Sequence, residues 1–258
     1  MNQEQRRIYL IEYLLSESGL QMQVPTDESG QKRLLRALFN VRMPSLASEE
    51  FLRVQDAYLK EELRLKGITD MANLTPIADD LYLWQGDITT LKCDAIVNAA
   101  NSQMLGCFCP NHGCIDNAIH TFAGVQLRQE CNEIMKRQGF EEPTGSAKIT
   151  KAYNLPCKYV LHTVGPIVHG KLTREEEEQL ASCYRTCLAL ADENALESIA
   201  FCCISTGEFH FPNDKAAEIA INTVKEYKRQ TNSGIKVVFN VFKEADDAIY
   251  ARLLGANR

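Results

Sequence analysis

Apolar residues recur every three to four positions along the first 75 residues of the chain, which predicts helices joined by polar segments. The stripes contain Ile8, Ile11 and Leu15, then Leu34, Leu35, Leu38 and Phe39, then Phe51, Val54, Tyr58, Leu59 and Leu63. Gly67 is a suitable residue to end the last of these helices. Because no catalytic motif falls here, residues 1–75 are predicted to form a helical region packed on a main domain that spans residues 76–258.

From Leu81 onward, short apolar runs alternate with helical patterns. Strands are predicted at residues 81–84, 95–97, 147–150, 159–163, 198–204 and 237–242, and helices at 115–137, 174–192, 214–229 and 245–254. Such alternation is typical of a layered α/β domain with a parallel or mixed central sheet. In the helix at 174–192, Cys183 and Cys187 fall on the apolar stripe, so they are expected to pack in the core.

The composition is that of an ordinary globular protein, with 45% hydrophobic and 24% charged residues. No apolar stretch approaches the roughly 20 residues needed to span a bilayer. We therefore expect a cytoplasmic protein, and we interpret the 10 cysteines as free thiols of a reducing compartment. The net charge of −6 argues against a nucleic-acid-binding surface, which requires clustered Lys and Arg.

A close group of metal-ligating side chains, Cys107, His112 and Cys114, stands out in this background. Two thiolates and an imidazole are ligands that Zn²⁺ prefers, and three protein ligands leave one position open, which favours a catalytic site. Cys109 is an alternative fourth ligand that would close the site and make the zinc structural. Since Pro110 restricts the backbone around it, we favour Cys109 as a bystander.

Polar residues follow several of the predicted strands, where ligands bind in open α/β sheets. Asp87 offers a carboxylate beside Gly86, although Gly-Asp is also a common turn pair. Asn98 and Asn101 suit sugar hydroxyls, or belong to an ordinary turn. Asp116 lies at the start of a predicted helix. Its carboxylate is either a functional acid of the site or an acid that simply complements the helix dipole.

A further segment, Ser205-Thr206-Gly207, leaves a predicted strand just before a helix. Consecutive free N–H groups at such a turn form a suitable cradle for phosphate oxygens. Phe209 would then stack on a sugar or cover the domain surface. His120 and His162 have no neighbour at ligand spacing, so we interpret them as core or supporting histidines.

Taken together, the motifs of this domain resemble those of a macrodomain in order and spacing. They are Gly86-Asp87-Ile88-Thr89, Val97-Asn98-Ala-Ala-Asn101-Ser102, Ile115-Asp116-Asn117-Ala-Ile-His120, Thr144-Gly145-Ser-Ala147-Lys148-Ile149-Thr150, His162-Thr163-Val164-Gly165-Pro166 and Ile204-Ser205-Thr206-Gly207. More narrowly, the chain resembles the zinc-containing macrodomains of microbial protein-ADP-ribose hydrolases. The resemblance implies a three-layer α/β/α fold with a mixed central sheet, preceded by an N-terminal helical region.

The same resemblance implies ADP-ribose as the ligand and assigns residues to it. Asp87 and the Ile88 N–H would bind adenine, Ser205, Thr206, Gly207 and Glu208 the diphosphate, and Asn98, Asn101 and Phe209 the distal ribose, with Cys114, Ile115 and Asn117 lining the same loop. Asp116, with Asn101, would act in catalysis. Glu208 departs from the usual pattern and is expected to point away from the phosphates. Asn240 and Phe242 are candidates to stack on adenine.

The implied activity is zinc-dependent hydrolysis of mono-ADP-ribosylated protein, with the ADP-ribose on Asp or Glu. The implied functional partner is a sirtuin-like ADP-ribosyltransferase, and a lipoyl-carrier protein is a candidate substrate. The alternative is a non-catalytic reader that binds ADP-ribose and carries a structural zinc. Only the group around Cys107 and the carboxylate of Asp116 distinguish the two.

Overall fold

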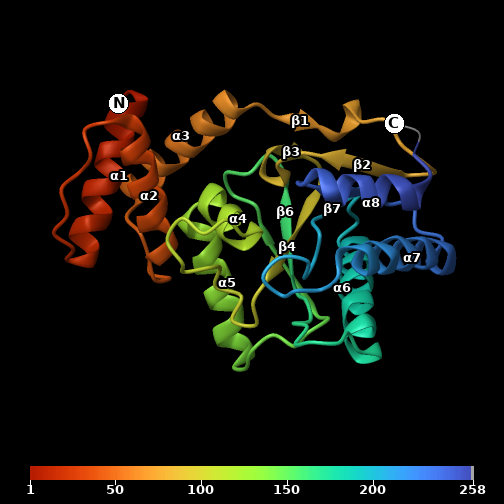
Figure 1. Cartoon of the computed structure of the whole chain (residues 1–258). Coiled ribbons are helices and arrows are strands. Elements are labelled where there is room, and N and C mark those ends of the chain that lie inside the picture. The colour runs from red at the N-terminus through yellow and green to blue at the C-terminus, as the bar shows by residue number, and fades with distance from the viewer. Residues whose placement is uncertain (257–258) are drawn as a thin grey trace.

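A mixed sheet forms the centre of the computed structural model, which describes residues 1–256 (Figure 1). Its strands are β2 (Leu81–Gln85), β4 (Ala95–Ala100), β5 (Ala147–Lys151), β6 (Tyr159–Val164), β7 (Ser198–Phe201) and β8 (Lys236–Val241). The sheet is 6-stranded, in the order β2-β8-β7-β4-β6-β5. All neighbours are parallel except β5, which runs antiparallel to β6. The predicted mixed sheet is confirmed.

Helices cover both faces of this sheet. Figure 1 shows α4 (Ile115–Ala123) and α5 (Val125–Gln138) on one side, and α6 (Arg174–Glu193), α7 (Asn213–Thr231) and α8 (Glu244–Leu254) on the other. The predicted stripe on α6 is buried, Cys183 and Cys187 included. The three-layer α/β/α architecture is therefore confirmed.

The N-terminal region contains α1 (Gln3–Ser18), α2 (Glu28–Val41) and α3 (Glu49–Lys66), each begun by a capping side chain from Asn2, Asp27 and Ser48 respectively. Their apolar faces form a separate core cluster that takes in Val125 from the main domain. The chain then forms β1 (Thr69–Asp70) and a short 3₁₀ turn, η1 (Met71–Asn73), and β1 pairs with β3 (Leu91–Lys92), which follows a second 3₁₀ turn, η2 (Ile88–Thr90). The boundary near residue 75 stays a prediction. None of the described helices could cross a membrane.

The single helix predicted at 115–137 is wrong, because the chain breaks at Gly124. Gly124 has φ +96°, and a Cβ there would lie 2.7 Å from Nε2 of the buried Gln55 on α3. Gln55 also accepts the N–H of Val125 at 2.9 Å, so it replaces a bond that a continuous helix would have made. A long-range contact with the N-terminal region thus decides a local structure.

Two strand ends also differ from prediction. β4 continues past Val97 to Ala100, which places Asn98 inside the strand, in register with His162 on β6. β7 ends at Phe201, earlier than predicted, because the chain turns out of the sheet and reaches a left-handed Ser205 (φ 64°). Both changes place polar residues at the carboxyl edge of the sheet.

Candidate active site

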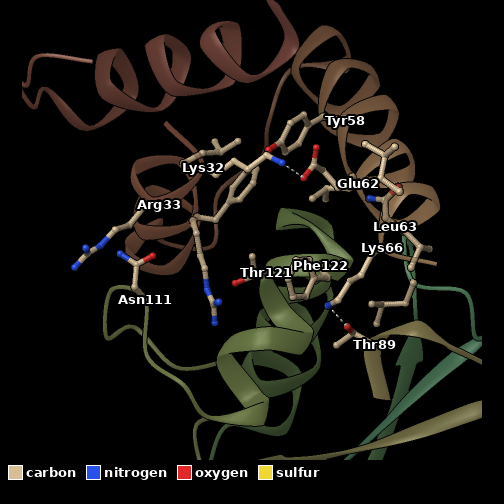
Figure 2. Close-up of a pocket in the computed structure, with 17 residues that line it drawn as sticks. Lys32, Arg33, Tyr58, Glu62, Leu63, Lys66, Thr89, Asn111, Thr121 and Phe122 are labelled. Carbon is tan, nitrogen blue, oxygen red and sulfur yellow. Dashed lines mark hydrogen bonds and ion pairs between the residues drawn. The ribbon is translucent and has the colours of Figure 1, made fainter. Parts of the chain in front are cut away.

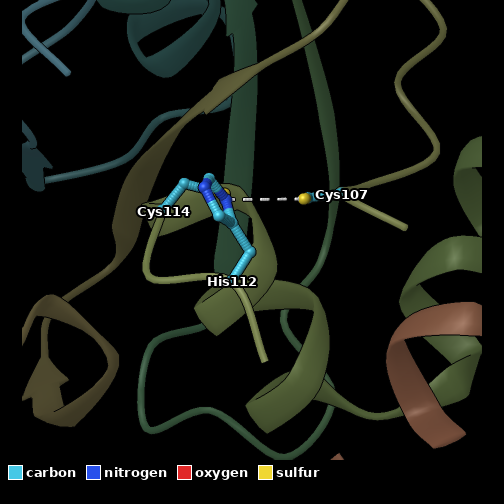
Figure 3. A group of neighbouring side chains, drawn as sticks. All are labelled: Cys107, His112 and Cys114. Atoms are coloured by element: carbon cyan, nitrogen blue, oxygen red, sulfur yellow. Dashed lines mark hydrogen bonds between the residues drawn. The ribbon is translucent and has the colours of Figure 1, made fainter. Parts of the chain in front are cut away.

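Two loops meet at the carboxyl edge of the sheet. We call residues 101–114, between β4 and α4, the metal loop, and residues 202–212, between β7 and α7, the phosphate loop. The metal loop contains Cys107, His112 and Cys114, whose ligand atoms all lie within 4.8 Å of one another (Figure 3). Cys109 is exposed and outside this cluster as the structure describes it.

The geometry of the cluster fits a tetrahedral zinc ion. Zn–S and Zn–N bonds of about 2.3 and 2.0 Å at a tetrahedral angle separate sulfur and nitrogen by about 3.5 Å. Cys107 Sγ and His112 Nδ1 are 3.7 Å apart. Burial, with a further contribution from the neighbouring Cys107, raises the pKa of Cys114 to about 12, although the Asn117 N–H opposes the shift. A divalent cation is the species that would hold both sulfurs as thiolates.

The N-terminal region anchors the metal loop from outside the main domain. Arg36 on α2 donates from Nη2 to the carbonyl of His112 at 3.0 Å and to Oδ1 of Asn117 at 2.9 Å. Asn40 accepts the N–H of Asn111 at 2.9 Å. The Asn117 side chain is buried and also donates to the Cys109 carbonyl at 3.0 Å, so it holds the loop from within the protein.

Arg128 on α5 fastens the other side of the metal loop. Its buried guanidinium donates to the carbonyl of Leu105 at 2.7 Å and lies 4.3 Å from the ring centroid of Phe108. It also donates to carbonyls at the end of α2, including that of Asn40 at 2.9 Å. Burial lowers the pKa of Arg128 to about 10, so the side chain remains a cation at neutral pH. One arginine therefore joins the metal loop to the N-terminal region.

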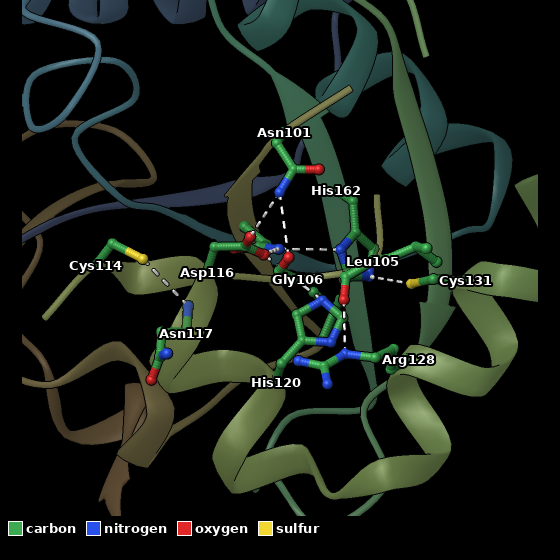
Figure 4. Close-up of polar contacts among 12 residues, drawn as sticks. Asn101, Leu105, Gly106, Cys114, Asp116, Asn117, His120, Arg128, Cys131 and His162 are labelled. Atoms are coloured by element: carbon green, nitrogen blue, oxygen red, sulfur yellow. Dashed lines mark hydrogen bonds and ion pairs between the residues drawn. The ribbon is translucent and has the colours of Figure 1, made fainter. Parts of the chain in front are cut away.

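Asp116 is the buried carboxylate of the site (Figure 4). Asn98 donates to its Oδ1 at 2.8 Å, and Asn101 lies 3.5 Å from its Oδ2. Burial raises the pKa of Asp116 to about 6, although Asn98 and Arg128 oppose the shift. The structure thus places Asn98 and Asn101, two of the residues predicted for the distal ribose, beside Asp116.

Behind Asp116 lie two buried histidines, His120 and His162, in agreement with their interpretation as core or supporting residues. His120 Nε2 is 3.6 Å from Asp116 Oδ1, and Gly106 packs on the His120 ring, where a Cβ would come within 2.7 Å of it. His162 contacts Asn98 at 3.1 Å and Thr150 at 2.9 Å. Burial lowers the pKa of both histidines, that of His162 to about 3, so both rings are neutral at physiological pH.

Although Cys131 joins His120 and His162 in a second group with ligand-like spacing, we assign it to the core. Burial raises the pKa of Cys131 far above its usual range, and Thr150 already occupies one nitrogen of His162. The i, i+4 spacing of Asp116 and His120 on one helix was the sequence signal that could have placed His120 at the site.

The phosphate loop presents a row of free donors. Within the described residues, the backbone N–H groups of residues 205–209 donate to no protein acceptor. The loop is braced from behind, since Phe211 donates its N–H to the Ser205 carbonyl at 3.0 Å and Val168 donates to the Phe209 carbonyl at 2.9 Å. Consecutive free N–H groups on a braced loop form an anion-binding nest.

The loops touch through Glu208 and His112, with Glu208 Oε1 3.5 Å from His112 Nε2. The side chain therefore turns toward the metal loop. At the start of α4, the N–H groups of Ile115 and Asp116 have no acceptor among the described residues, while the N–H of Asn117 donates to Cys114 Sγ at 3.4 Å. Free donors thus lie in the phosphate loop and at the N-terminus of α4.

At the other end of the predicted ligand site, Asp87 caps η2 and accepts the N–H of Thr89 at 2.9 Å. Its second oxygen pairs with Lys66, from the last turn of α3. Burial alone would raise the pKa of Asp87, but Lys66 and Thr89 leave it below its ordinary value. Asn240 is buried and bonded to the Gly86 carbonyl at 2.9 Å, whereas Phe242 is 74% exposed and free to stack.

A cavity of about 590 Å³ lies next to this site, between α2, α3 and α4 (Figure 2). It is lined by apolar side chains such as Phe122 and by four cations. Two of these are paired with acids, Lys32 with Glu62 at 2.9 Å and Lys66 with Asp87, and the others are Arg33 and Arg36. The cavity therefore lies beside the predicted ligand site and shares with it the Thr89 edge.

Comparison with known proteins settles the family. The sequence profile of the Macro domain matches residues 97–220. A protein-ADP-ribose hydrolase of Treponema medium is 60% identical to the chain over 260 residues, covering 98% of this chain and 100% of that protein. The chain belongs to the macrodomain family of protein-ADP-ribose hydrolases. It is an enzyme, and the predictions of a macrodomain and of a protein-ADP-ribose hydrolase are confirmed; the narrower assignment to the zinc-containing macrodomains stays a prediction.

Other relatives of this macrodomain hydrolase add detail. A Trypanosoma brucei macrodomain solved in complex with ADP-ribose is 30% identical, with a TM-score of 0.66 over 85% of this chain and 95% of that chain. A probable bifunctional ADP-ribose hydrolase/ADP-ribosyltransferase of Fusarium oxysporum f. sp. cubense is 42% identical over 242 residues, covering 86% of this chain and 40% of that protein. The name of the Fusarium protein thus assigns a probable ADP-ribose hydrolase and a probable ADP-ribosyltransferase to one polypeptide.

Proposed function

We propose that the protein removes ADP-ribose from modified Asp or Glu side chains, with a zinc ion held by Cys107, His112 and Cys114. The observation that carries the proposal is the contact between the phosphate loop and the metal loop at Glu208 and His112. A diphosphate on the free N–H groups of residues 205–209 would bring the distal ribose to Asp116.

The proposed ligand runs between the ends of this site. Asp87 and the Ile88 N–H would hold the adenine, with Phe242 stacked on it, and the N–H groups of Ser205, Thr206, Gly207 and Glu208 would hold the diphosphate. Phe209 would pack on the distal ribose, and Asn101 would bind a ribose hydroxyl. The N–H groups of Ile115 and Asp116 are free for the same ligand.

The chain's residues supply the proton chemistry. Asp116, whose pKa of about 6 leaves it ionised at neutral pH, orients a water molecule toward C1″ and accepts its proton. The water oxygen then bonds to C1″ while the bond from C1″ to the carboxylate oxygen breaks, and the carboxylate leaves with the electron pair. When bound, zinc supplies a Lewis acid that polarises a ribose hydroxyl or the leaving carboxylate. Asn98 and His120 hold Asp116 in place.

A hydrolase of this kind requires an enzyme that attaches the ADP-ribose. We propose a sirtuin-like ADP-ribosyltransferase for that step and a lipoyl-carrier protein as the modified substrate. The joined hydrolase and transferase names of the Fusarium relative support such a pairing.

The test measures ADP-ribose released from a protein modified on acidic side chains. Wild type, metal-stripped wild type and the Cys107→Ala variant are compared, each with and without added Zn²⁺. We expect release by wild type, loss after stripping, recovery with Zn²⁺, and no recovery for Cys107→Ala. Full activity of the stripped protein would refute the role of zinc, and binding of ADP-ribose without release in every form would identify a reader.

A further inference from the structure

The ring of His112 has different neighbours at its two nitrogens. Nδ1 faces Cys107 Sγ at 3.7 Å, within the metal cluster. Nε2 faces the opposite way and meets Oε1 of Glu208 at 3.5 Å. The metal loop therefore offers one nitrogen to the cluster, and the phosphate loop supplies a carboxylate for the other.

We propose that Glu208 is a positioning residue for the zinc site, which accepts the Nε2–H of His112 and so directs the Nδ1 lone pair at the metal. A neutral imidazole carries one donor and one acceptor nitrogen, so a carboxylate on one side fixes the lone pair on the other. Histidines that bind metals usually donate their second N–H in this way. The inference rests on the proposed zinc site.

The contribution of Glu208 is orientation more than charge attraction. Its side chain is 69% exposed and that of His112 32%, and an exposed pair of this kind contributes little stability by itself. The 3.5 Å separation is longer than a hydrogen bond, so a closure of about 0.5 Å would complete it. Loss of such a partner costs roughly 10-fold to 100-fold in metal affinity, and the exposure of Glu208 favours the lower value.

The phosphate loop holds Glu208 in reach of His112. Ser205 has a positive φ of 64° and packs against Gly165, where a Cβ would lie 2.0 Å from its Oγ. His210 donates its N–H to the Gly207 carbonyl at 3.1 Å, which closes the turn around Glu208. A single residue thus serves both loops, with its backbone N–H free for the phosphates and its side chain turned to the metal loop.

The experiment measures zinc affinity by competition with a chromophoric chelator. Wild type, Glu208→Gln and Glu208→Ala are compared, with Glu244→Ala as the control because Glu244 is an exposed acid on α8. We expect Glu208→Ala to bind zinc about 10-fold more weakly. Glu208→Gln should stay near wild type, since its amide oxygen still accepts the Nε2–H, and Glu244→Ala should not change.

A second readout uses wild type alone. Imidazole ¹⁵N NMR of the zinc-loaded protein should place the His112 proton on Nε2 and the metal on Nδ1. Unchanged zinc affinity in Glu208→Ala, or zinc bound through Nε2, would overturn the role of Glu208 while leaving the zinc site intact. Failure of wild type to bind zinc at all would instead overturn the site itself, and the role of Glu208 with it.

Discussion

Asp116 and His120 face each other one helical turn apart on α4, with the carboxylate Oδ1 3.6 Å from the imidazole Nε2. Both side chains are buried. Burial raises the pKa of Asp116 to about 6 and lowers that of His120 well below its usual range. At neutral pH the pair is therefore a carboxylate beside a neutral ring, which lets Asp116 accept a proton.

The first prediction is a rise of activity with pH. Because the proposed reaction needs ionised Asp116, kcat/KM should increase through about pH 6 and level off above it. The measurement is the initial rate of ADP-ribose release between about pH 5 and pH 8, at saturating zinc. A profile that is flat across this range would contradict the assignment of Asp116.

Asp116→Asn should make the folded protein more stable at neutral and higher pH while it lowers the enzymatic activity. The pKa of Asp116 in the folded protein, about 6, lies above its ordinary value of 3.8, so its favourable contribution to folding is present below the lower value and lost as pH rises through about 6. Above that pH, the ionised buried carboxylate costs on the order of 3 kcal/mol, from a shift of about two pH units. The neutral amide removes this cost.

We therefore expect Asp116→Asn to unfold at higher denaturant concentration than wild type at about pH 8, while its kcat falls about 100-fold or more. Near pH 4 the difference in stability should nearly vanish, since wild type is then largely protonated as well. A less stable variant at pH 8 would refute the argument from burial.

Asp87→Ala should weaken ADP-ribose binding by roughly 10-fold, the effect of losing one hydrogen bond to a charged acceptor. The reacting bond is remote from Asp87, so KM should rise more than kcat falls. Asp70→Ala is the matched control, because Asp70 also caps a 3₁₀ turn and pairs with a lysine, Lys92, at 2.7 Å. Calorimetry with free ADP-ribose would decide, and equal affinities for both variants would contradict the adenine assignment.

Arg36→Met should speed the release of zinc. Without the guanidinium, the His112 carbonyl and the Asn117 side chain lose their partner on α2, and the metal loop gains freedom. We expect a zinc dissociation rate several-fold above wild type, measured with excess chelator. Arg33→Met, an exposed arginine on the same helix, is the control. Equal rates in both variants would show that α2 does not steady the loop.

Arg128→Met should destabilise the whole chain by about 3 kcal/mol, because it leaves several carbonyls that are now bonded to Arg128 without a donor. For a protein of this size, that corresponds to a melting temperature lower by about 10 °C. Scanning calorimetry measures it. A shift under about 2 °C would mean that water satisfies these carbonyls instead.

Much of the candidate site could be predicted because its functional residues lie in short sequence motifs. Cys107, His112 and Cys114 are close in sequence, so local loop geometry brings their ligand atoms together. The parallel sheet then explains why Asn98 and the phosphate loop, which are remote in sequence, meet at one edge. Hydrophobic periodicity was sufficient to locate the strands and to predict a layered α/β domain, whereas the three-layer arrangement was predicted from the resemblance to macrodomains.

What could not be predicted depends on contacts between remote segments. The helix break at Gly124 needs Gln55 from α3, and no local signal distinguishes it from a tolerated glycine within a helix. The pairing of Asp87 with Lys66 and the contact of Glu208 with His112 join residues that are 21 and 96 positions apart in the sequence. The contact between His120 and Asp116 could not be predicted either, because their spacing becomes informative only once both are known to be buried.

The guanidinium of Arg128 bonds both to the metal loop and to the carbonyls at the end of α2, and Val125 belongs to the apolar cluster of the N-terminal helices. Residues 97–220, which the Macro domain profile matches, therefore make close contacts with helices that lie outside that match. A shortened version of the protein for crystallisation or fusion should therefore keep the first helices, because a fragment that begins at the sheet would lose the contacts that α2 makes with the metal loop.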